Sequence, residues 1–128
     1  MNINKVHHIA IICSDYAISK EFYVEKLGFR IIREVHREAR QSYKLDLDLD
    51  GHTQIELFSF PHPPPRPSYP EALGLRHLAF EVADLDAAID DLTSRGIAVE
   101  PVRVDEFTGK KCTFFADPDG LPLEIYEA

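Results

Sequence analysis

The chain has 128 residues, of which 45% are hydrophobic and 28% charged, and its formal net charge is -8. This size and composition predict a single compact soluble domain, and no apolar run approaches the ~18 residues of a membrane span. The acidic balance, without a Lys/Arg cluster, argues against nucleic acid as a partner, because such binding depends on neutralising phosphates.

The first residues and the two cysteines indicate the compartment. Residues 1–5 lead directly into a strand pattern and lack the apolar core of a signal peptide, so we expect a cytoplasmic protein. Cys13 and Cys112 belong to no paired spacing. They therefore predict two reduced thiols rather than a disulfide or a Cys-based zinc site.

The first half of the chain predicts one strand, one helix and three further strands. Residues 6–11 alternate as a strand, and the apolar stripe over residues 15–27 predicts a helix that Asp15 begins and Gly28 ends. Strands are then expected over residues 29–34, 43–48 and 53–60. A proline-rich segment follows at residues 61–72, and its composition predicts a semi-rigid extended linker.

The second half repeats this order. A strand over residues 75–80, a helix from Asp84 or Asp86 to Gly96, and strands over residues 99–104, 111–116 and 121–126 are expected. Three matching pairs lie 68 or 69 positions apart, namely His8 and His77, Gly28 and Gly96, and Glu56 and Glu124. The repeat predicts two modules, about residues 1–60 and about residues 73–128, within one domain.

The repeated histidines and glutamates predict a metal site. Strand alternation places His8, Glu56, His77 and Glu124 on the sheet faces opposite the helices. One helix cannot cover both faces of a four-stranded sheet, so the modules should pair and bring these residues together. Two imidazoles and two carboxylates suit Zn, Ni, Co, Mn or Fe(II) and leave coordination positions open for a substrate.

Taken singly, a histidine or glutamate on a strand is usually hydrogen-bonded or solvent-exposed, and the argument for metal depends on the repetition. Glu81 lies on the same face as His77 and is expected to support the site or to be solvated. No metal role is expected for the remaining histidines, which are His7, His36, His52 and His62.

The sequence resembles the vicinal oxygen chelate superfamily, and within it bacterial glyoxalase I and its short relatives. The matching segments are residues 6–10, 22–23, 27–29, 54–57, 75–82 and 117–120, the last leading into Glu124. The resemblance implies an α+β fold in which two βαββ modules form a curved mixed sheet around one divalent ion. It also implies a small-molecule substrate and a homodimer.

The complete His, Glu, His, Glu set resembles glyoxalase I, which isomerises the hemithioacetal of glutathione and methylglyoxal. It implies a lyase that acts on a small α-hydroxycarbonyl compound or hemithioacetal through a metal-bound enediolate, with glutathione or another thiol as co-substrate. The resemblance favours Glu124 as the base and Glu56 as a ligand or second acid-base group, without ranking the two firmly.

Two other functions stay open for the same fold. One is an Fe(II)-dependent ring-cleaving dioxygenase, and the other is a non-catalytic module that binds a small ligand or confers resistance. No residues match a glutathione-binding set. Phe58 and Tyr126 are candidates for a pocket wall, and the candidates for binding an anionic group are Arg33, Arg37, Arg40, Lys110 and Lys111.

Overall fold

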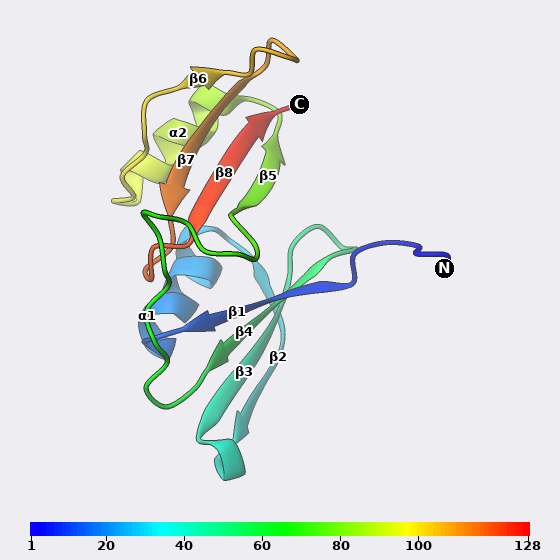
Figure 1. Cartoon of the computed structure of the whole chain (residues 1–128), viewed down its shortest axis with the longest axis vertical. Helices are drawn as coiled ribbons and strands as arrows, with labels where there is room; N and C mark the ends of the chain where they lie inside the picture. The colour runs from blue at the N-terminus through cyan, green and yellow to red at the C-terminus, as the bar shows by residue number, and fades with distance from the viewer. The chain divides into compact units, whose positions relative to one another are not determined.

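Two units with the same order of elements make up the chain. The computed structural model describes residues 1–128, which divide into the units Met1–Pro65 and Arg66–Ala128. Each unit contains one strand, a helical segment and three further strands that form a four-stranded mixed sheet (Figure 1). The expected α+β fold of two modules is confirmed. None of the helices has the length and apolar content needed to cross a membrane.

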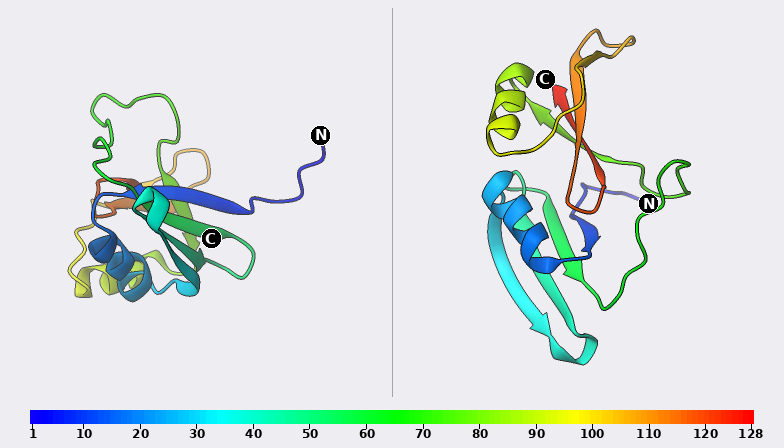
Figure 2. Two further views of the ribbon diagram at one scale, coloured as in Figure 1. Left: turned by 90° about the horizontal axis from the view of Figure 1, so that it is seen from below. Right: turned by 90° about the vertical axis from the view of Figure 1, so that its left-hand side faces the viewer.

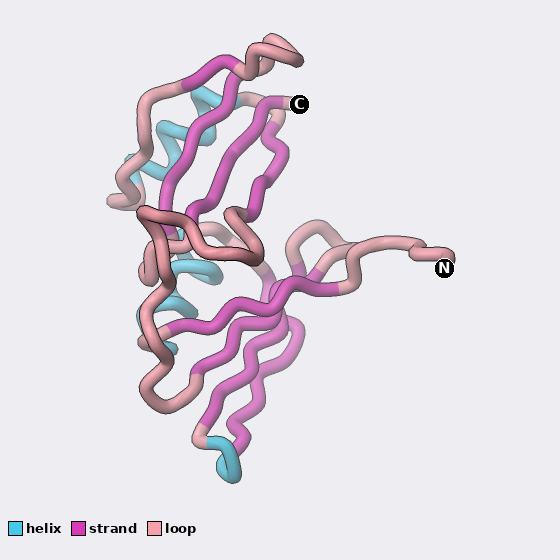
Figure 3. The backbone as a smooth tube through the Cα atoms, in the orientation of Figure 1, coloured by secondary structure: helices cyan, strands magenta, loops and turns pink.

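Unit 1 contains a sheet with the strand order β1-β4-β3-β2, drawn as neighbouring tubes in Figure 3. β1 runs parallel to β4, and the other neighbours are antiparallel. Its elements are β1 (His8–Cys13), α1 (Tyr16–Lys20), the π-helical segment η1 (Glu21–Lys26), β2 (Arg30–Arg37), the 3-10 turn η2 (Glu38–Arg40), β3 (Ser42–Asp48) and β4 (Gln54–Ser59).

The core of unit 1 lies between the sheet and its helical segment, which runs along one face of the strands (Figure 2). The alternate residues of β3 and β4 that face this layer are fully buried, namely Leu45, Leu47, Ile55 and Leu57. Burying a side chain of this size contributes about 1.5–3 kcal/mol. The residues between them therefore point to the opposite face, as the strand alternation predicts.

The first helix differs from the single α-helix predicted over residues 15–27. Asp15 caps α1 by accepting a hydrogen bond from the backbone of Ile18. The helix then widens into η1, where the Leu27 N–H donates to the carbonyl of Phe22, five residues earlier. Phe22 and Tyr23 are both buried, and the wider turn lets two consecutive rings reach the core. Apolar periodicity alone does not reveal this widening.

Unit 2 contains a sheet with the strand order β5-β8-β7-β6, in which β5 and β8 are parallel. Asp84 caps its helix by accepting a hydrogen bond from the backbone of Ala87. Leu85, Leu123 and Ile125 form part of the buried layer between helix and sheet. The elements are β5 (Leu78–Val82), α2 (Leu85–Ser94), β6 (Arg103–Val104), β7 (Lys111–Ala116) and β8 (Pro122–Glu127).

The strand predicted over residues 99–104 is shorter than expected, because only β6 pairs in a ladder. The Glu100 N–H still donates to the Phe114 carbonyl at 2.9 Å, but Pro101 has no N–H to donate. Instead the Thr113 hydroxyl donates to the carbonyls of Glu100 and Pro101, at 2.7 and 3.2 Å. A buried side chain therefore replaces backbone pairing at this edge.

The segment predicted to be an extended linker folds back on itself in its second part. One guanidinium nitrogen of Arg66 donates to the carbonyls of Leu75 and Arg76, at 3.0 and 2.8 Å. These two bonds close the loop of residues 66–76, so the expectation of an extended spacer was wrong here. Proline content predicts a locally stiff backbone, but it does not predict a loop closure that depends on one arginine side chain.

Candidate metal centre

His8 and Glu56 lie side by side on the face of sheet β1-β4-β3-β2 that is opposite α1. The parallel register pairs Ala10 with Glu56, and His8 shares the face of Ala10 two residues earlier. The His8 Nδ1 atom is 3.2 Å from Glu56 Oε2, with the side chains 44% and 13% exposed. The pair is thus open to solvent on the histidine side and sheltered on the carboxylate side.

His77 and Glu124 form the equivalent pair in unit 2. The register pairs Ala79 with Glu124, as Ala10 pairs with Glu56 in unit 1. The His77 Nε2 atom is 3.0 Å from Glu124 Oε2, and these side chains are 25% and 13% exposed. The Phe114 ring meets the His77 ring edge to face, with centroids 5.1 Å apart. This contact fixes the plane of the imidazole.

The donor atoms of each pair fit a divalent ion. An ion bound at about 2.0–2.2 Å by a nitrogen and an oxygen at right angles holds those atoms about 3 Å apart. The measured separations of 3.2 and 3.0 Å match that value. They also suit a direct hydrogen bond between imidazole and carboxylate. Within each unit no three His, Cys, Asp or Glu side chains are arranged so that together they could hold a metal ion.

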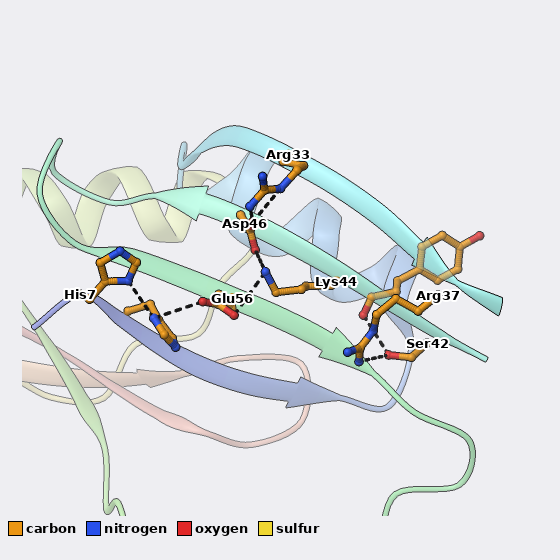
Figure 4. A network of polar contacts seen from close by, with 9 residues as sticks. His7, Arg33, Arg37, Ser42, Lys44, Asp46 and Glu56 are labelled. Carbon is orange, nitrogen blue, oxygen red and sulfur yellow. Dashed lines mark hydrogen bonds and ion pairs between the residues drawn. The ribbon is translucent and has the colours of Figure 1, made fainter. Parts of the chain in front are cut away.

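A chain of charges extends from the His8 and Glu56 pair along the same face (Figure 4). The Lys44 ammonium lies 3.4 Å from Glu56 Oε1 and 2.8 Å from Asp46 Oδ1. Arg33 donates to Asp46 Oδ2 at 2.9 Å. Asp46 is only 2% exposed, so it anchors both cations at the centre of the sheet.

The charges in this chain shift two pKa values. The hydrogen bond to Asp46 is the main cause that raises the pKa of Lys44 above its usual value. Burial alone would raise the pKa of Asp46, but the hydrogen bonds from Lys44 and Arg33 outweigh it and lower that pKa. Both groups are therefore charged around neutral pH, and Lys44 stays a cation beside Glu56.

Unit 2 lacks this cation at the equivalent position. Cys112 stands 68 positions after Lys44 and, like it, pairs with an aromatic residue of the last strand, Tyr126. Burial and the neighbouring Glu124 carboxylate raise the pKa of the Cys112 thiol. Cys112 is therefore a neutral thiol at physiological pH. Glu124 has no ion-pair partner other than His77, so the two carboxylates differ in their surroundings.

The structure separates the basic residues that were candidates for binding an anion. Arg33 is engaged by Asp46, and Lys111 forms an ion pair with Asp86 at 3.2 Å. The Arg37 guanidinium lies over the rings of Phe58 and Phe60, with its carbon 5.1 and 5.8 Å from their centroids. Arg40 and Lys110 are exposed in turns between strands. Of these five, Arg37 alone adjoins a predicted wall residue.

Other predicted residues also have definite surroundings. His7 was expected to have no role, yet its Nδ1 atom is 2.9 Å from that of His8. Glu81 is exposed and pairs in register with Tyr126. The Tyr126 hydroxyl donates to Asp105 at 2.9 Å, so that ring is tied to the loop before β7. Strand parity was right about the face of Tyr126 but did not predict this bond.

A cavity that the sequence did not predict lies beside His77. It has a volume of about 100 Å³, and the residues around it include Arg66, Tyr69, Arg76, His77, Arg103 and Phe114. Of these residues, Arg66 and Tyr69 come from the segment that the sequence predicted only as a linker, and Arg76 from the strand predicted over residues 75–80. No local signal identified the cavity, because Arg66, Arg76 and Arg103 stand far apart in the sequence.

The chain is similar to known proteins over nearly its whole length. The model of the glyoxalase/bleomycin resistance protein/dioxygenase superfamily matches residues 5–125. The uncharacterized protein YwkD of Bacillus subtilis is 62% identical over 127 residues, which are 99% of this chain and 99% of that protein. The crystal structure of a glyoxalase family protein from Enterococcus faecalis has a TM-score of 0.93 at 56% identity and covers 99% of this chain and 100% of that chain. The 2-epi-5-epi-valiolone epimerase of an Actinomyces species is 30% identical over 141 residues, 94% of this chain and 77% of the epimerase.

Proposed function

Because the chain belongs to the glyoxalase/bleomycin resistance protein/dioxygenase superfamily, we propose that it is a metal-dependent enzyme that moves a proton between neighbouring atoms of a small carbonyl compound. The substrate is an α-hydroxycarbonyl compound or a hemithioacetal, as for a lyase of the glyoxalase I kind. One divalent ion, Ni, Co, Zn, Mn or Fe, is the proposed cofactor, and His8, Glu56, His77 and Glu124 are its proposed ligands.

The observation that carries the proposal is the repetition of one donor pair in both units. Each unit presents a histidine nitrogen and a glutamate oxygen, 3.2 and 3.0 Å apart, on the sheet face opposite its helix. Imidazole and carboxylate donors suit the divalent transition metals. When bound, such an ion supplies Lewis-acid stabilisation of the negative charge that develops on adjacent substrate oxygens.

The different surroundings of the two carboxylates support different roles for Glu56 and Glu124. Glu56 already forms an ion pair with the Lys44 ammonium at 3.4 Å, so one of its oxygens is engaged by a cation. Glu124 forms an ion pair with His77 alone, and the neutral thiol of Cys112 lies nearby. We therefore assign proton transfer to Glu124, which removes a proton from one atom and returns it to the next, and binding to Glu56.

One relative agrees with this class of reaction. The Actinomyces protein is named an epimerase, and epimerisation beside a carbonyl also removes a proton and returns it. The thiol that forms a hemithioacetal, glutathione or another, would be a co-substrate. We further propose that the protein acts as a homodimer, which sedimentation of the metal-loaded protein would test.

The proposal is tested by hydrogen exchange at carbon. The purified protein, loaded in turn with Ni, Co, Zn and Mn, is mixed in D₂O with hydroxyacetone or with the hemithioacetal of methylglyoxal and glutathione. Proton NMR then follows conversion and deuterium incorporation. We expect metal-dependent exchange or conversion that Glu124→Gln lowers about 10²–10⁴-fold. Glu56→Gln should mainly weaken metal binding.

Glu81→Gln is the matched control, because Glu81 is an exposed glutamate on the same strand face as His77. Its exchange rate should equal that of the unaltered protein. Equal loss in Glu81→Gln and Glu124→Gln would contradict the assignment of the base. No metal-dependent exchange with either compound, together with oxygen-dependent opening of a catechol by the Fe(II)-loaded protein, would replace the proposal with a ring-cleaving dioxygenase.

A further inference from the structure

The cavity beside His77 is built by the loop that Arg66 closes. One guanidinium nitrogen of Arg66 holds the carbonyls of Leu75 and Arg76, at 3.0 and 2.8 Å. Around the same cavity, Arg103 lies over the ring of Phe114, with its guanidinium carbon 5.1 Å from the centroid. We call this cavity the arginine pocket, after Arg66, Arg76 and Arg103, which all line it.

The positive charges of the arginine pocket are only partly compensated. Arg103 forms an ion pair with Glu100 at 3.2 Å, whereas neither Arg66 nor Arg76 has a carboxylate within 4.0 Å. The remaining acid on its wall, Glu71, is exposed and forms no ion pair. The Nε atom of Arg66 is buried without a hydrogen-bond partner. A buried donor without a partner is unfavourable, so a ligand group that accepts a hydrogen bond from it would be stabilised there.

A second hollow in unit 1 shows the contrast. It has a volume of about 240 Å³ and is lined by Lys5 and Arg30 among other residues. There Arg30 forms an ion pair with Asp48 at 3.0 Å, and Lys5 donates to the carbonyl of His52 at 3.2 Å. Because both cations already have partners, this larger hollow is less suited to binding an anion than the arginine pocket.

The position of the arginine pocket connects it with the proposed metal ligand of unit 2. An Arg76 nitrogen lies 3.4 Å from His77 Nδ1, while the Nε2 atom of His77 faces Glu124 at 3.0 Å. The Phe114 ring contacts both His77 and Arg103. An anion in the pocket would therefore lie next to the imidazole but on the side away from its pairing with Glu124.

The size of the pocket limits what it holds. The arginine pocket has a volume of about 100 Å³. Pockets that enclose a whole ligand have volumes of about 300 Å³ or more. The arginine pocket therefore takes one terminal group of a substrate. Guanidinium groups match carboxylates and phosphates by paired hydrogen bonds.

We infer that the arginine pocket binds a carboxylate or phosphate group of the substrate, so that the substrate is a small anionic α-hydroxycarbonyl compound. This inference rests on the proposed function for the reacting end of the substrate. The pocket itself is a property of unit 2 alone and can be tested without metal.

The first test measures anion binding by the full, metal-free protein. Inorganic phosphate and malonate are titrated separately by calorimetry into the unaltered protein, Arg76→Gln, Arg66→Lys and Arg95→Gln. Arg95 is the matched control, because it is an arginine of unit 2 that pairs with Asp91 on α2 outside the pocket. We expect at least one probe to bind, Arg76→Gln to weaken it about tenfold, and Arg95→Gln to leave it unchanged.

Arg66→Lys keeps a charge but loses the remaining guanidinium donors, including Nε, so binding should also weaken. Circular dichroism and metal content of all variants, equal to those of the unaltered protein, show that folding and the metal ligands are intact. Failure of both probes to bind would overturn the inference. So would equal affinities in Arg76→Gln and Arg95→Gln.

The second test compares three α-hydroxyketones with the metal-loaded protein. Hydroxyacetone is neutral, hydroxypyruvate carries a carboxylate and dihydroxyacetone phosphate carries a phosphate. The kcat/KM for deuterium exchange should be higher for one of the two anionic compounds than for hydroxyacetone. The preferred compound shows whether the pocket binds a carboxylate or a phosphate. Arg76→Gln should reduce this preference about tenfold. An unchanged preference in Arg76→Gln would refute the role of the pocket.

The two proposals fail in different ways. Without exchange of any of the three ketones under any metal, the proposed function fails, whereas Arg76-dependent binding of phosphate or malonate to the metal-free protein still establishes the pocket. With exchange but no effect of Arg76→Gln, the proposed function stands and the pocket is refuted.

Discussion

Replacement of Asp46 by Asn removes the anion that anchors two cations on the sheet of unit 1. The carboxylate, 2% exposed, accepts hydrogen bonds from Arg33 at 2.9 and 3.2 Å and from Lys44 at 2.8 Å. Fully buried charge-assisted bonds would be worth about 1.5–3 kcal/mol each. The Arg33 side chain is 66% exposed and that of Lys44 25%. Solvent screening therefore reduces the expected total loss to about 1–2 kcal/mol.

The effect of Asp46→Asn should depend on pH in a defined direction. The pKa of Asp46 is held below its ordinary value of 3.8. A carboxyl whose pKa is lower in the folded state stabilises the protein above the unfolded pKa, and this stabilisation is lost as the pH falls through the folded pKa. The difference between the two proteins should be constant from pH 7 to about pH 5 and should shrink below pH 3.8.

Urea unfolding followed by far-ultraviolet circular dichroism measures this difference at pH 7, pH 5 and about pH 3. Asp86→Asn is the control, because the Asp86 side chain is 73% exposed in its ion pair with Lys111. That change should cost less than about 0.5 kcal/mol. Equal losses in Asp46→Asn and Asp86→Asn at pH 7, or a loss for Asp46→Asn that persists at low pH, would refute the anchoring role.

Two further changes test the local structure. Cys112 is buried, and burial and the neighbouring Glu124 raise its pKa above 9.0. Iodoacetamide should therefore alkylate Cys112 slowly at pH 7.5 and rapidly in urea, as followed by mass spectrometry. Fast alkylation of Cys112 in the native protein would contradict this environment. Gly96 has a φ of +80° and a Cβ there would meet no atom within 4 Å. Gly96→Ala should therefore lower the free energy of unfolding by about 1–2 kcal/mol from backbone strain alone. Gly96→Asn should lower it less, and thermal unfolding measures both changes. Equal losses in the two variants would indicate a steric cause instead.

Strand alternation made the faces of the sheets predictable. The buried pair Ile55 and Leu57 defines the inner face of β4, so Glu56 had to point to the other side. The repeat of 68 or 69 positions transferred the same reasoning to Glu124. The capping role of Asp15 was also predictable, because a carboxylate before an apolar stripe accepts the first free N–H groups of a helix. For the second helix the same rule left Asp84 and Asp86 as candidates, and the structure has Asp84 as the cap.

Features that depend on side chains distant in sequence were not predictable. The Thr113 hydroxyl that replaces a ladder bond at Pro101 lies on another strand. Lys44 reaches Glu56 because the register of β3 and β4 pairs Asp46 with Glu56, and one shifted residue would have removed the contact. The arginine pocket needs Arg66 to close a loop that local composition describes as extended.

The metal content of the purified chain tests the central claim most directly. Protein produced without a histidine tag is analysed by inductively coupled plasma and native mass spectrometry, beside His8→Ala, His77→Ala and the control His36→Ala, whose ring packs on Tyr43. The account predicts about one divalent transition-metal ion per chain, lost in both His8→Ala and His77→Ala and retained in His36→Ala. No stoichiometric ion after reloading, or an ion that survives loss of either histidine, would contradict a single site shared by the two His and Glu pairs.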